Sequence, residues 1–280
     1  MSKIIYAPKG AAAEYSKYAA NFYVGCLGDK GCSYCYCLRV LRGYWPDKPT
    51  LKKCLENEDK AMQIFMKEAD QNIKDLRKHG LFFNFVSDPF LPETIDLNTL
   101  AMRYCIINEI PVIALTKQTR WVEDFIMEMD QNETVWNLDY HRVQQLMAFG
   151  FTLTGHDDLE PGCATNEDRI RAMRVLSDEG FKTWASIEPI IDFDSSWRMI
   201  EQTLGSCDLY KIGLKSGGKY NVSEAQRFTL RVMAAARCNH TKVYFKDSFV
   251  SMLRVTREEM SHWQWGGCLV DRDYNMFTEQ

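Results

Sequence analysis

Four cysteines lie within twelve residues of this 280-residue chain, in the segment NFYVGCLGDKGCSYCYC at 21–37. They are Cys26, Cys32, Cys35 and Cys37. Soft thiolate ligands at this density are typical of zinc sites and of iron–sulfur clusters. The intervening glycines let a short loop wrap around an ion or a cluster with its backbone N–H groups pointing inward. The segment therefore predicts a metal site.

The spacing of possible ligands favours a cluster over zinc. Structural zinc sites generally take their ligands from two pairs that are well separated in sequence. Only one such pair, Cys32 and Cys35, is present here, and the five histidines are scattered along the chain. A compact zinc loop is thus the less favoured alternative. Three thiolates on a [4Fe–4S] cluster would leave one iron open for a small molecule, which suits a functional site.

Composition places the chain among globular proteins, with 46% hydrophobic and 26% charged residues. No apolar run reaches the roughly 18–20 residues that a membrane helix needs, and the N-terminus lacks the apolar core of a signal peptide. We therefore expect a cytoplasmic protein without a membrane partner. In that compartment the ten cysteines favour metal binding and buried thiols over disulfides. The expected core cysteines are Cys54, Cys105, Cys207 and Cys238.

Net charge bears on the partner. The formal charge of −4 argues against a protein dedicated to duplex DNA, although a local basic groove remains compatible with it.

Strand-like apolar segments alternate with amphipathic segments from residue 54 onward. Helical spacing predicts a long helix over 54–79, and then helices at about 96–109, 166–179, 195–204 and 223–237, with helical material up to Phe149. Strands are expected at 82–86, 111–115, 151–154, 183–187, 209–214 and 242–245. This alternation predicts an α/β fold with a parallel sheet, either open or closed into a barrel.

Polar residues follow the predicted strands at their carboxyl ends. They are Ser87 and Asp88, Thr116 and Lys117, Thr154, Glu188, Lys215 and Ser216, and Lys246 and Asp247. In parallel α/β folds the functional site lies at this edge of the sheet. We therefore expect these side chains to lie near the cysteine loop.

Seven motifs in order resemble the radical S-adenosylmethionine (radical SAM) superfamily, and more narrowly its spore photoproduct lyase-like branch, which includes phage- and prophage-associated proteins. They are IYAPKGAAAEY at 5–15, NFYVGC at 21–26, CSYCY at 32–36, VSDPFLPE at 86–93, LTK at 115–117, LEPGCATNEDRI at 159–170 and ASIEPI at 185–190, and YFKDS at 244–248 is similar to a late strand of the phage-associated proteins. The resemblance covers about residues 4–250. It implies a partial parallel (β/α)6 barrel over 21–250, an N-terminal extension at 1–20 and a C-terminal cap at 251–280.

The resemblance also implies roles for individual residues. Cys26, Cys32 and Cys35 would be the ligands of a [4Fe–4S] cluster. Residues that would contact S-adenosylmethionine (SAM) are Tyr34 near the adenine, Ser87 and Asp88 at the amino group, Lys117 at the carboxylate or ribose, and Thr154 and Glu188 as further contacts. Asp88 suits an ammonium partner and Lys117 a carboxylate partner.

One spacing departs from the family pattern. The cysteines read Cys-x5-Cys-x2-Cys, whereas the family usually has Cys-x3-Cys-x2-Cys, and Gly28 and Gly31 could absorb the extra length. Cys37 is a rival ligand. It ranks lower because Cys35 and Cys37, one residue apart, would point in opposite directions in an extended chain.

The activity implied is reductive cleavage of SAM to a 5′-deoxyadenosyl radical that abstracts hydrogen from a substrate, with a one-electron reductant such as a flavodoxin or ferredoxin as partner. By analogy the substrate would be a nucleic acid, either a DNA lesion or a modified base. Basic residues interleaved with aromatic ones after the cysteines suit that substrate, although they suit a solvated loop equally well: Arg39, Arg42, Tyr44, Trp45, Lys48, Lys52 and Lys53.

Two alternatives stay open. One is a radical SAM enzyme that acts on a peptide or a small metabolite. The other is a non-catalytic iron–sulfur or zinc-binding module, which would have no reason to place Ser87, Asp88 and Lys117 on successive strand ends. In the aromatic tail at 262–277, Cys268 could donate hydrogen to a substrate radical, or the tail could simply pack against the barrel.

Overall fold

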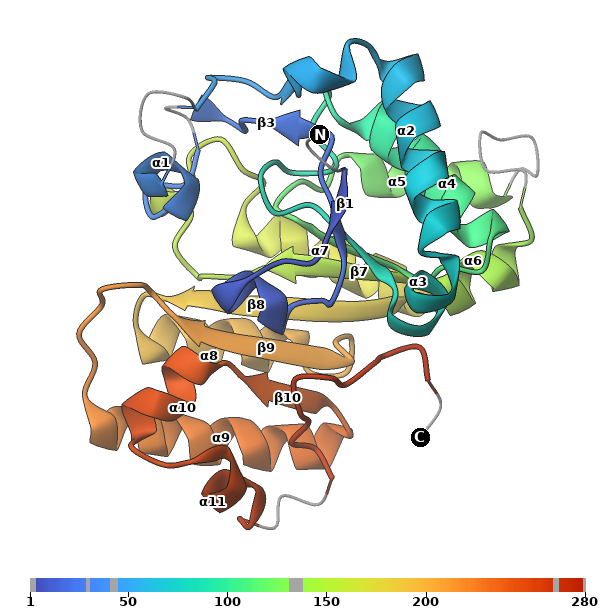
Figure 1. Cartoon of the computed structure of the whole chain (residues 1–280). Helices are drawn as coiled ribbons and strands as arrows, with labels where there is room; N and C mark the ends of the chain where they lie inside the picture. The colour runs from blue at the N-terminus through green and yellow to red at the C-terminus, as the bar shows by residue number, and fades with distance from the viewer. Residues whose placement is uncertain (1–3, 29–30, 41–44, 131–137, 264–266, 279–280) are drawn as a thin grey trace. The chain divides into compact units, whose positions relative to one another are not determined.

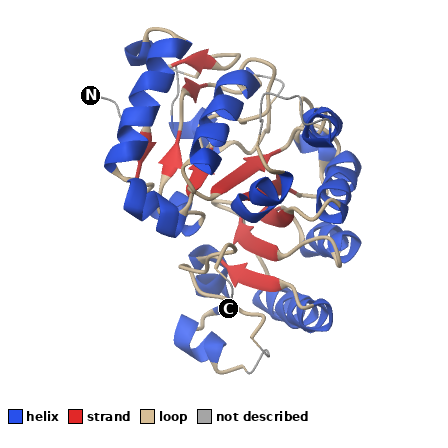
Figure 2. Cartoon of the chain, turned by 90° about the vertical axis from the view of Figure 1, so that its right-hand side faces the viewer, coloured by secondary structure: helices blue, strands red, loops and turns tan. Residues whose placement is uncertain are grey.

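The computed structural model describes residues 4–28, 31–40, 45–130, 138–263 and 267–278 (Figure 1). The chain divides into two compact units. The first unit comprises Met1–Phe149, Asp158–Ala164 and Phe277–Gln280, and the second comprises Gly150–Asp157 and Thr165–Met276. Both combine helices with strands (Figure 2).

The strands of the first unit follow one another in the order β1 (Ile5–Tyr6), β2 (Ala19–Ala20), β5 (Leu81–Phe83), β6 (Val112–Thr116) and the first half of β7 (Met147–Thr152). β1 pairs with β2 antiparallel, whereas the β2–β5 and β5–β6 pairs are parallel. A separate antiparallel ribbon joins β3 (Tyr23–Val24) to β4 (Thr50–Leu51). The predicted extension at 1–20 therefore supplies two strands.

The helices of the first unit are α1 (Tyr36–Val40), α2 (Glu58–Gln71), α3 (Ile73–His79), α4 (Ile95–Ile107), α5 (Trp121–Asp130) and α6 (Tyr140–Leu146). Aromatic side chains join them to the strands. Phe65 of α2 is fully buried, and its ring centroid lies 5.4 Å from that of Phe22 and 6.3 Å from that of Phe83 on β5. Burying rings of this size is a principal source of the stability of such a core.

The second unit contains the rest of β7, followed by β8 (Lys182–Ile190), β9 (Leu209–Leu214) and β10 (Lys242–Phe245). The β8–β9 and β9–β10 pairs are parallel. Its helices are α7 (Asn166–Asp178), α8 (Phe193–Thr203), α9 (Val222–Asn239), α10 (Asp247–Leu253) and α11 (Arg257–Ser261).

One face of β9 packs on α8. The hydroxyl of Tyr210 donates to the carbonyl of Ile200 at 3.2 Å and lies 2.9 Å from the hydroxyl of Thr203, both on α8. Because successive side chains of a strand point to opposite faces, Lys211 and Gly213 lie on the face away from α8.

The predicted elements are largely confirmed. β9 and β10 match their predicted ranges residue for residue, and α7 starts at the predicted cap, where the Thr165 side chain accepts a hydrogen bond from the Asp168 N–H. The α/β class with mostly parallel strands is also confirmed. No helix in the described part of the chain is long and apolar enough to cross a membrane.

Two predictions of helices were wrong. The helix expected over 54–79 is divided into α2 and α3 at Asn72, and α2 begins only after Asn57, whose side chain caps it. Phe149 lies in β7, which is buried at every residue, and not in helical material. A short continuous apolar run has the same pattern in a buried strand as in a buried helix, so periodicity could not separate them.

Two of the four cysteines expected in the core are elsewhere. Cys105 and Cys207 are buried, but Cys54 and Cys238 are exposed. Cys54 lies in a 3-10 turn at Lys53–Leu55, and Cys238 lies in the last turn of α9. Their apolar neighbours in sequence did not indicate which way the side chains point.

Candidate metal and cofactor site

The cysteine loop is joined to a distant segment of the first unit, Leu159–Cys163, by three adjacent contacts. The Sγ atoms of Cys32 and Cys163 lie 3.9 Å apart, the N–H of Ser33 donates to the carbonyl of Leu159 at 2.9 Å, and the hydroxyl of Tyr34 donates to the carboxylate of Glu160. These contacts hold the loop against residues more than 120 positions later in the chain.

Lys117, at the end of β6, lies beside the same loop. Its Nζ is 5.7 Å from the centroid of the Tyr34 ring, which is within the range of a cation–π contact. The carbonyl of Lys117 accepts a hydrogen bond from Ala164 at 3.0 Å. Burial lowers the pKa of the Lys117 ammonium, but nearby negative charge, including that of Cys32 and Glu160, raises it by more. The site thus keeps one fixed positive charge.

Two of the predicted cluster ligands are thiols with lowered pKa. A hydrogen bond from Cys163 lowers the pKa of Cys32 to about 6, against an opposing effect of burial. A hydrogen bond from Cys37 likewise lowers the pKa of Cys35 to about 6. The same bonds raise the pKa of the partner thiols, Cys163 and Cys37. Thiolates, the form that binds metal, are therefore favoured at Cys32 and Cys35.

Cys26, the third predicted ligand, lies within electrostatic reach of the strand ends. Burial raises its pKa to about 12, the charge of Asp88 adds to this, and Lys117 opposes it. Asp88, Lys117 and Cys32 are thus all neighbours of Cys26.

The start of α1 corrects one argument from the sequence. The chain is not extended between Cys35 and Cys37, because α1 begins at Tyr36. Opposite directions are therefore no reason to rank Cys37 below the others. It is buried, with 2% of its surface exposed, whereas Cys26, Cys32 and Cys35 are only partly buried.

Asp88, which follows β5, is hydrogen-bonded to residues at the end of β6. One carboxylate oxygen accepts from the Thr116 hydroxyl at 2.7 Å and from the Phe90 N–H at 3.0 Å, and the other accepts from the Lys117 N–H at 2.8 Å. Burial raises the pKa of Asp88 although these bonds lower it. The Asp88 carboxylate thus positions the backbone of Lys117. It could also bind a ligand directly.

Next to Asp88 is a polar group without a protein partner. The Ser87 Oγ is buried and has no hydrogen-bond partner among the described residues, and the same holds for the side-chain Nε2 of Gln118 and the Oδ1 of Asn84. A buried polar atom left without a partner costs about 1–3 kcal/mol. Three such atoms around the ends of β5 and β6 fit a polar ligand that would complete their bonds.

Thr154 and Glu188, the remaining predicted SAM contacts, lie in the second unit. Thr154 is fully buried, and its hydroxyl accepts from the His156 N–H at 3.2 Å. Glu188 accepts from the Nζ of Lys246 at 2.6 Å, on the face of the sheet away from α8. A Cβ on Gly213 would come within 2.8 Å of the Glu188 carboxyl, so this glycine leaves room for the ion pair. Both side chains are engaged within their own unit.

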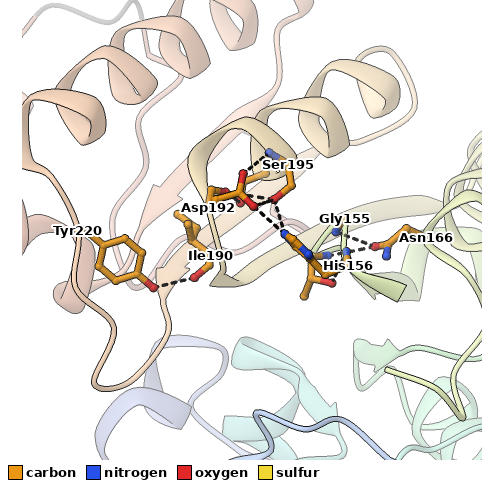
Figure 3. Close-up of polar contacts among 9 residues, drawn as sticks. Gly155, His156, Asn166, Ile190, Asp192, Ser195 and Tyr220 are labelled. Carbon is orange, nitrogen blue, oxygen red and sulfur yellow. Dashed lines mark hydrogen bonds and ion pairs between the residues drawn. The ribbon is translucent and has the colours of Figure 1, made fainter. Parts of the chain in front are cut away.

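A second polar cluster follows β7 and β8 in the second unit (Figure 3). The Nε2 of His156 lies 2.7 Å from the carboxylate of Asp192 and 3.1 Å from the Ser195 hydroxyl, and that hydroxyl donates to the same carboxylate at 2.8 Å. In a Ser–His–Asp triad the acid and the serine contact different ring nitrogens. Here both meet one nitrogen, and Asp192 caps α8 by accepting from the Ser195 N–H. The cluster therefore positions a helix start.

The thiols of the cysteine loop are donors of the type that an iron–sulfur cluster takes. No three His, Cys, Asp or Glu side chains of the described residues are grouped so that they could hold a metal ion. A [4Fe–4S] cluster binds each cysteine through a different iron, so its ligands need not converge on a point. The fit rests on three partly buried thiols from one loop and on the partnerless atoms beside it.

Glu160 and Cys163 were not predicted as site residues. Glu160 is 2% exposed and meets Tyr34, and Cys163 meets Cys32. Both lie within the LEPGCATNEDRI motif, which could have marked them as candidate site residues. Cys163 is also a thiol far in sequence from Cys32 and Cys35, and structural zinc sites take their ligands from two such separated segments.

The remaining predicted residues are Cys268 and the basic–aromatic stretch after the cysteines. Cys268 is buried in the second unit, where its carbonyl accepts from the Val243 N–H at 2.8 Å. Of the basic–aromatic stretch, Arg42, Tyr44 and the side chain of Arg39 lie outside the described residues. Lys48 and Lys53 are exposed.

Comparison with known proteins adds one relative. The uncharacterized protein MJ0683 of Methanocaldococcus jannaschii is 25% identical over 186 residues, which are 63% of this chain and 61% of that protein. The chain thus aligns with about three fifths of the length of this relative. No family model matches the sequence, and no solved structure matches it significantly.

Proposed function

We propose that the protein is a radical SAM enzyme, in which a [4Fe–4S] cluster and SAM bind at the cysteine loop and the ends of β5 and β6. One observation carries the proposal: Cys26, Cys32, Tyr34, Asp88 and Lys117, which come from three separate segments, are neighbours in the first unit. A module that only stored metal would not need an ammonium and an aromatic ring beside its thiols.

The proposed roles follow from residue chemistry. Cys26, Cys32 and Cys35 would hold the cluster. The chemistry that the cluster and SAM would supply there is abstraction of a hydrogen atom from a substrate. The Lys117 ammonium would bind the SAM carboxylate, and the Ser87 hydroxyl would bind a polar group of SAM, since it has no partner among the described residues.

Other residues of the site would act by positioning. Asp88 holds the Lys117 backbone at 2.8 Å, and Glu160 holds Tyr34, whose ring would pack near the adenine. Glu160 is buried, and three hydrogen bonds hold the Asp88 carboxylate in place.

The finer fold belongs to the same proposal. A partial (β/α)6 barrel needs successive strands that are neighbours in chain order, and β5, β6 and β7 in one unit and β7 to β10 in the other follow that order. A flavodoxin or ferredoxin would be the reductant. A nucleic-acid substrate is supported by the exposed Lys48 and Lys53 after the cysteine loop.

The test is anaerobic reconstitution with iron and sulfide, followed by addition of SAM and a strong reductant. We expect the visible absorption of an iron–sulfur cluster and formation of 5′-deoxyadenosine, both lost in Cys26→Ala, Cys32→Ala and Cys35→Ala. Cys54→Ser, which alters an exposed thiol, is the matched control. Loss of the cluster in Cys37→Ala would overturn the ligand assignment, and absence of 5′-deoxyadenosine with a full cluster would overturn the proposal.

A second candidate is a thiolate site for one zinc ion, without SAM chemistry. The separation of 3.9 Å between the Cys32 and Cys163 sulfurs favours it. Two thiolates on one tetrahedral ion, each with a Zn–S bond of about 2.3 Å, lie roughly 3.8 Å apart. Stoichiometric zinc in protein purified without added metal, with no uptake of iron and sulfide, would favour this candidate.

A further inference from the structure

Cys32 and Cys163 bring together two thiols from remote segments of the chain. Their Sγ atoms lie 3.9 Å apart although the residues are 131 positions apart in the chain. A disulfide requires about 2.05 Å between the sulfurs. Side-chain rotation is sufficient to supply a closure of this size when the backbones are already adjacent.

The backbones beside the two thiols are adjacent and fixed. The next residue after Cys32 donates its N–H to Leu159 at 2.9 Å, and the one after that, Tyr34, bonds to Glu160. The Cys163 N–H donates to the Glu160 carbonyl at 2.9 Å, which closes a turn. The two sulfurs are therefore held within reach by contacts that do not involve sulfur.

Both thiols are accessible to a small oxidant. Each is partly buried, whereas Cys37, Cys105 and Cys207 are buried. Cys54 is exposed as well, but it makes no thiol–thiol hydrogen bond within the described residues. Cys32 is thus both reachable by an oxidant and next to a second thiol.

We propose that Cys32 and Cys163 form a reversible disulfide that blocks metal loading of the cysteine loop. With a peroxide as oxidant, one thiolate attacks the O–O bond and becomes a sulfenic acid with release of hydroxide. The second thiol then attacks that sulfur and water leaves, so that two thiols and one hydrogen peroxide give one disulfide and two waters. A dithiol reductant reverses the step by thiol–disulfide exchange.

The consequence for loading rests on the proposed function, because Cys32 is a ligand only in that proposal. A disulfide sulfur has no thiolate charge and cannot ligate iron as a cysteinate does. The oxidised form would therefore lack one of three ligands. The disulfide itself depends only on the proximity of the Cys32 and Cys163 sulfurs.

The first experiment tests the disulfide. Full-length protein is freed of metal with a chelator, reduced, desalted without air and treated with one equivalent of hydrogen peroxide. We expect two of the ten thiols to be lost and a cross-linked peptide that joins Cys32 to Cys163, reversed by dithiothreitol. Cys163→Ser should lack this peptide and Cys54→Ser should keep it, with circular dichroism to verify folding. Cross-links of Cys32 mainly to Cys26, Cys35 or Cys37, or loss of no thiol pair, would overturn the proposal.

The second experiment tests the block. Iron and sulfide are offered to oxidised and to re-reduced protein, and bound iron is measured. We expect oxidised wild-type protein to take up at least about tenfold less iron, because a ligand is masked, and peroxide-treated Cys163→Ser to lose less of its uptake. Equal uptake by both wild-type forms would overturn the block. If re-reduced protein takes up no iron at all, the cross-linked peptide still decides the disulfide, and the proposed function fails instead.

Discussion

The hydroxyl of Tyr34 donates a hydrogen bond to the carboxylate of Glu160, which is only 2% exposed. Tyr34→Phe removes this donor and leaves a buried acceptor less satisfied, so we expect the free energy of unfolding to fall by about 1–3 kcal/mol. Urea unfolding under reducing conditions measures it.

Tyr36→Phe is the matched control. Tyr36 is 50% exposed and donates to the carbonyl of Phe85 at 2.8 Å, so its loss should cost about 0.5–1.5 kcal/mol. An equal or smaller cost for Tyr34→Phe would contradict the structural importance of the Tyr34–Glu160 bond.

Ser87→Ala and Thr116→Val should differ in their effect on the free energy of unfolding. Ser87→Ala removes a buried hydroxyl without a partner in the described residues, so the free energy of unfolding should not fall and should rise by up to about 1–3 kcal/mol. Thr116→Val removes the donor 2.7 Å from Asp88, and should cost about 1–3 kcal/mol.

If the proposed function holds, Ser87→Ala should weaken the binding of SAM although it does not lower the stability of the fold. Ser87→Ala should raise the Kd for SAM by about tenfold, equivalent to one lost hydrogen bond of about 1.4 kcal/mol. Equilibrium dialysis with reconstituted protein measures it. A Kd unchanged in Ser87→Ala would remove Ser87 from the proposed site.

Glu188 should be needed for stability whether or not SAM binds. Glu188→Gln leaves the ammonium of Lys246, whose side chain is 2% exposed, without its carboxylate at 2.6 Å. Breaking a buried pair on one side costs about 3 kcal/mol or more, whereas replacing both partners costs less. We therefore expect Glu188→Gln with Lys246→Met to unfold at higher urea than Glu188→Gln alone. Additive losses would show that the ion pair is not the reason.

Asp192 should make stability depend on pH. Burial raises its pKa, but bonds from Ser195 and His156 outweigh this, so the folded-state pKa lies below the ordinary value. A depressed carboxyl pKa contributes stability that is present above the unfolded pKa of about 3.9 and is lost as pH falls through the folded pKa. The stability difference between wild type and Asp192→Asn should thus be constant near neutral pH and shrink below about pH 4. Thermal unfolding at several pH values tests it, and a difference that persists in acid would contradict the assignment.

Much of this arrangement was predictable because the relevant signals are local. The ranges of β9 and β10 matched because each is a short apolar run bounded by polar or glycine residues. The start of α7 matched because Thr165 and Asp168 have capping spacing. Lys117 and Asp88 were predictable as neighbours since carboxyl ends of adjacent parallel strands meet at one edge.

What could not be predicted depends on contacts between distant residues. The motif around Cys163 marks it as a candidate thiol but does not identify Cys32 as its neighbour, and nothing near Glu188 indicates that it pairs with Lys246. The ranking of Cys37 below the other cysteines depended on an extended chain, whereas α1 begins at Tyr36. Local patterns determine which elements form, but side-chain pairing across elements follows only from their packing.

The division of the chain has a practical consequence for any attempt to move this site to another protein. Asp158–Ala164 belongs to the first unit, although the residues on both sides of it belong to the second. A fragment ending at Phe149 would therefore contain all four cysteines of the loop and yet lack the Glu160 and Cys163 that contact it. A transplant of the cysteine loop would therefore have to include two non-contiguous segments of the chain. A simple truncation would contain the thiols of the loop but not the residues that contact them, Glu160 and Cys163.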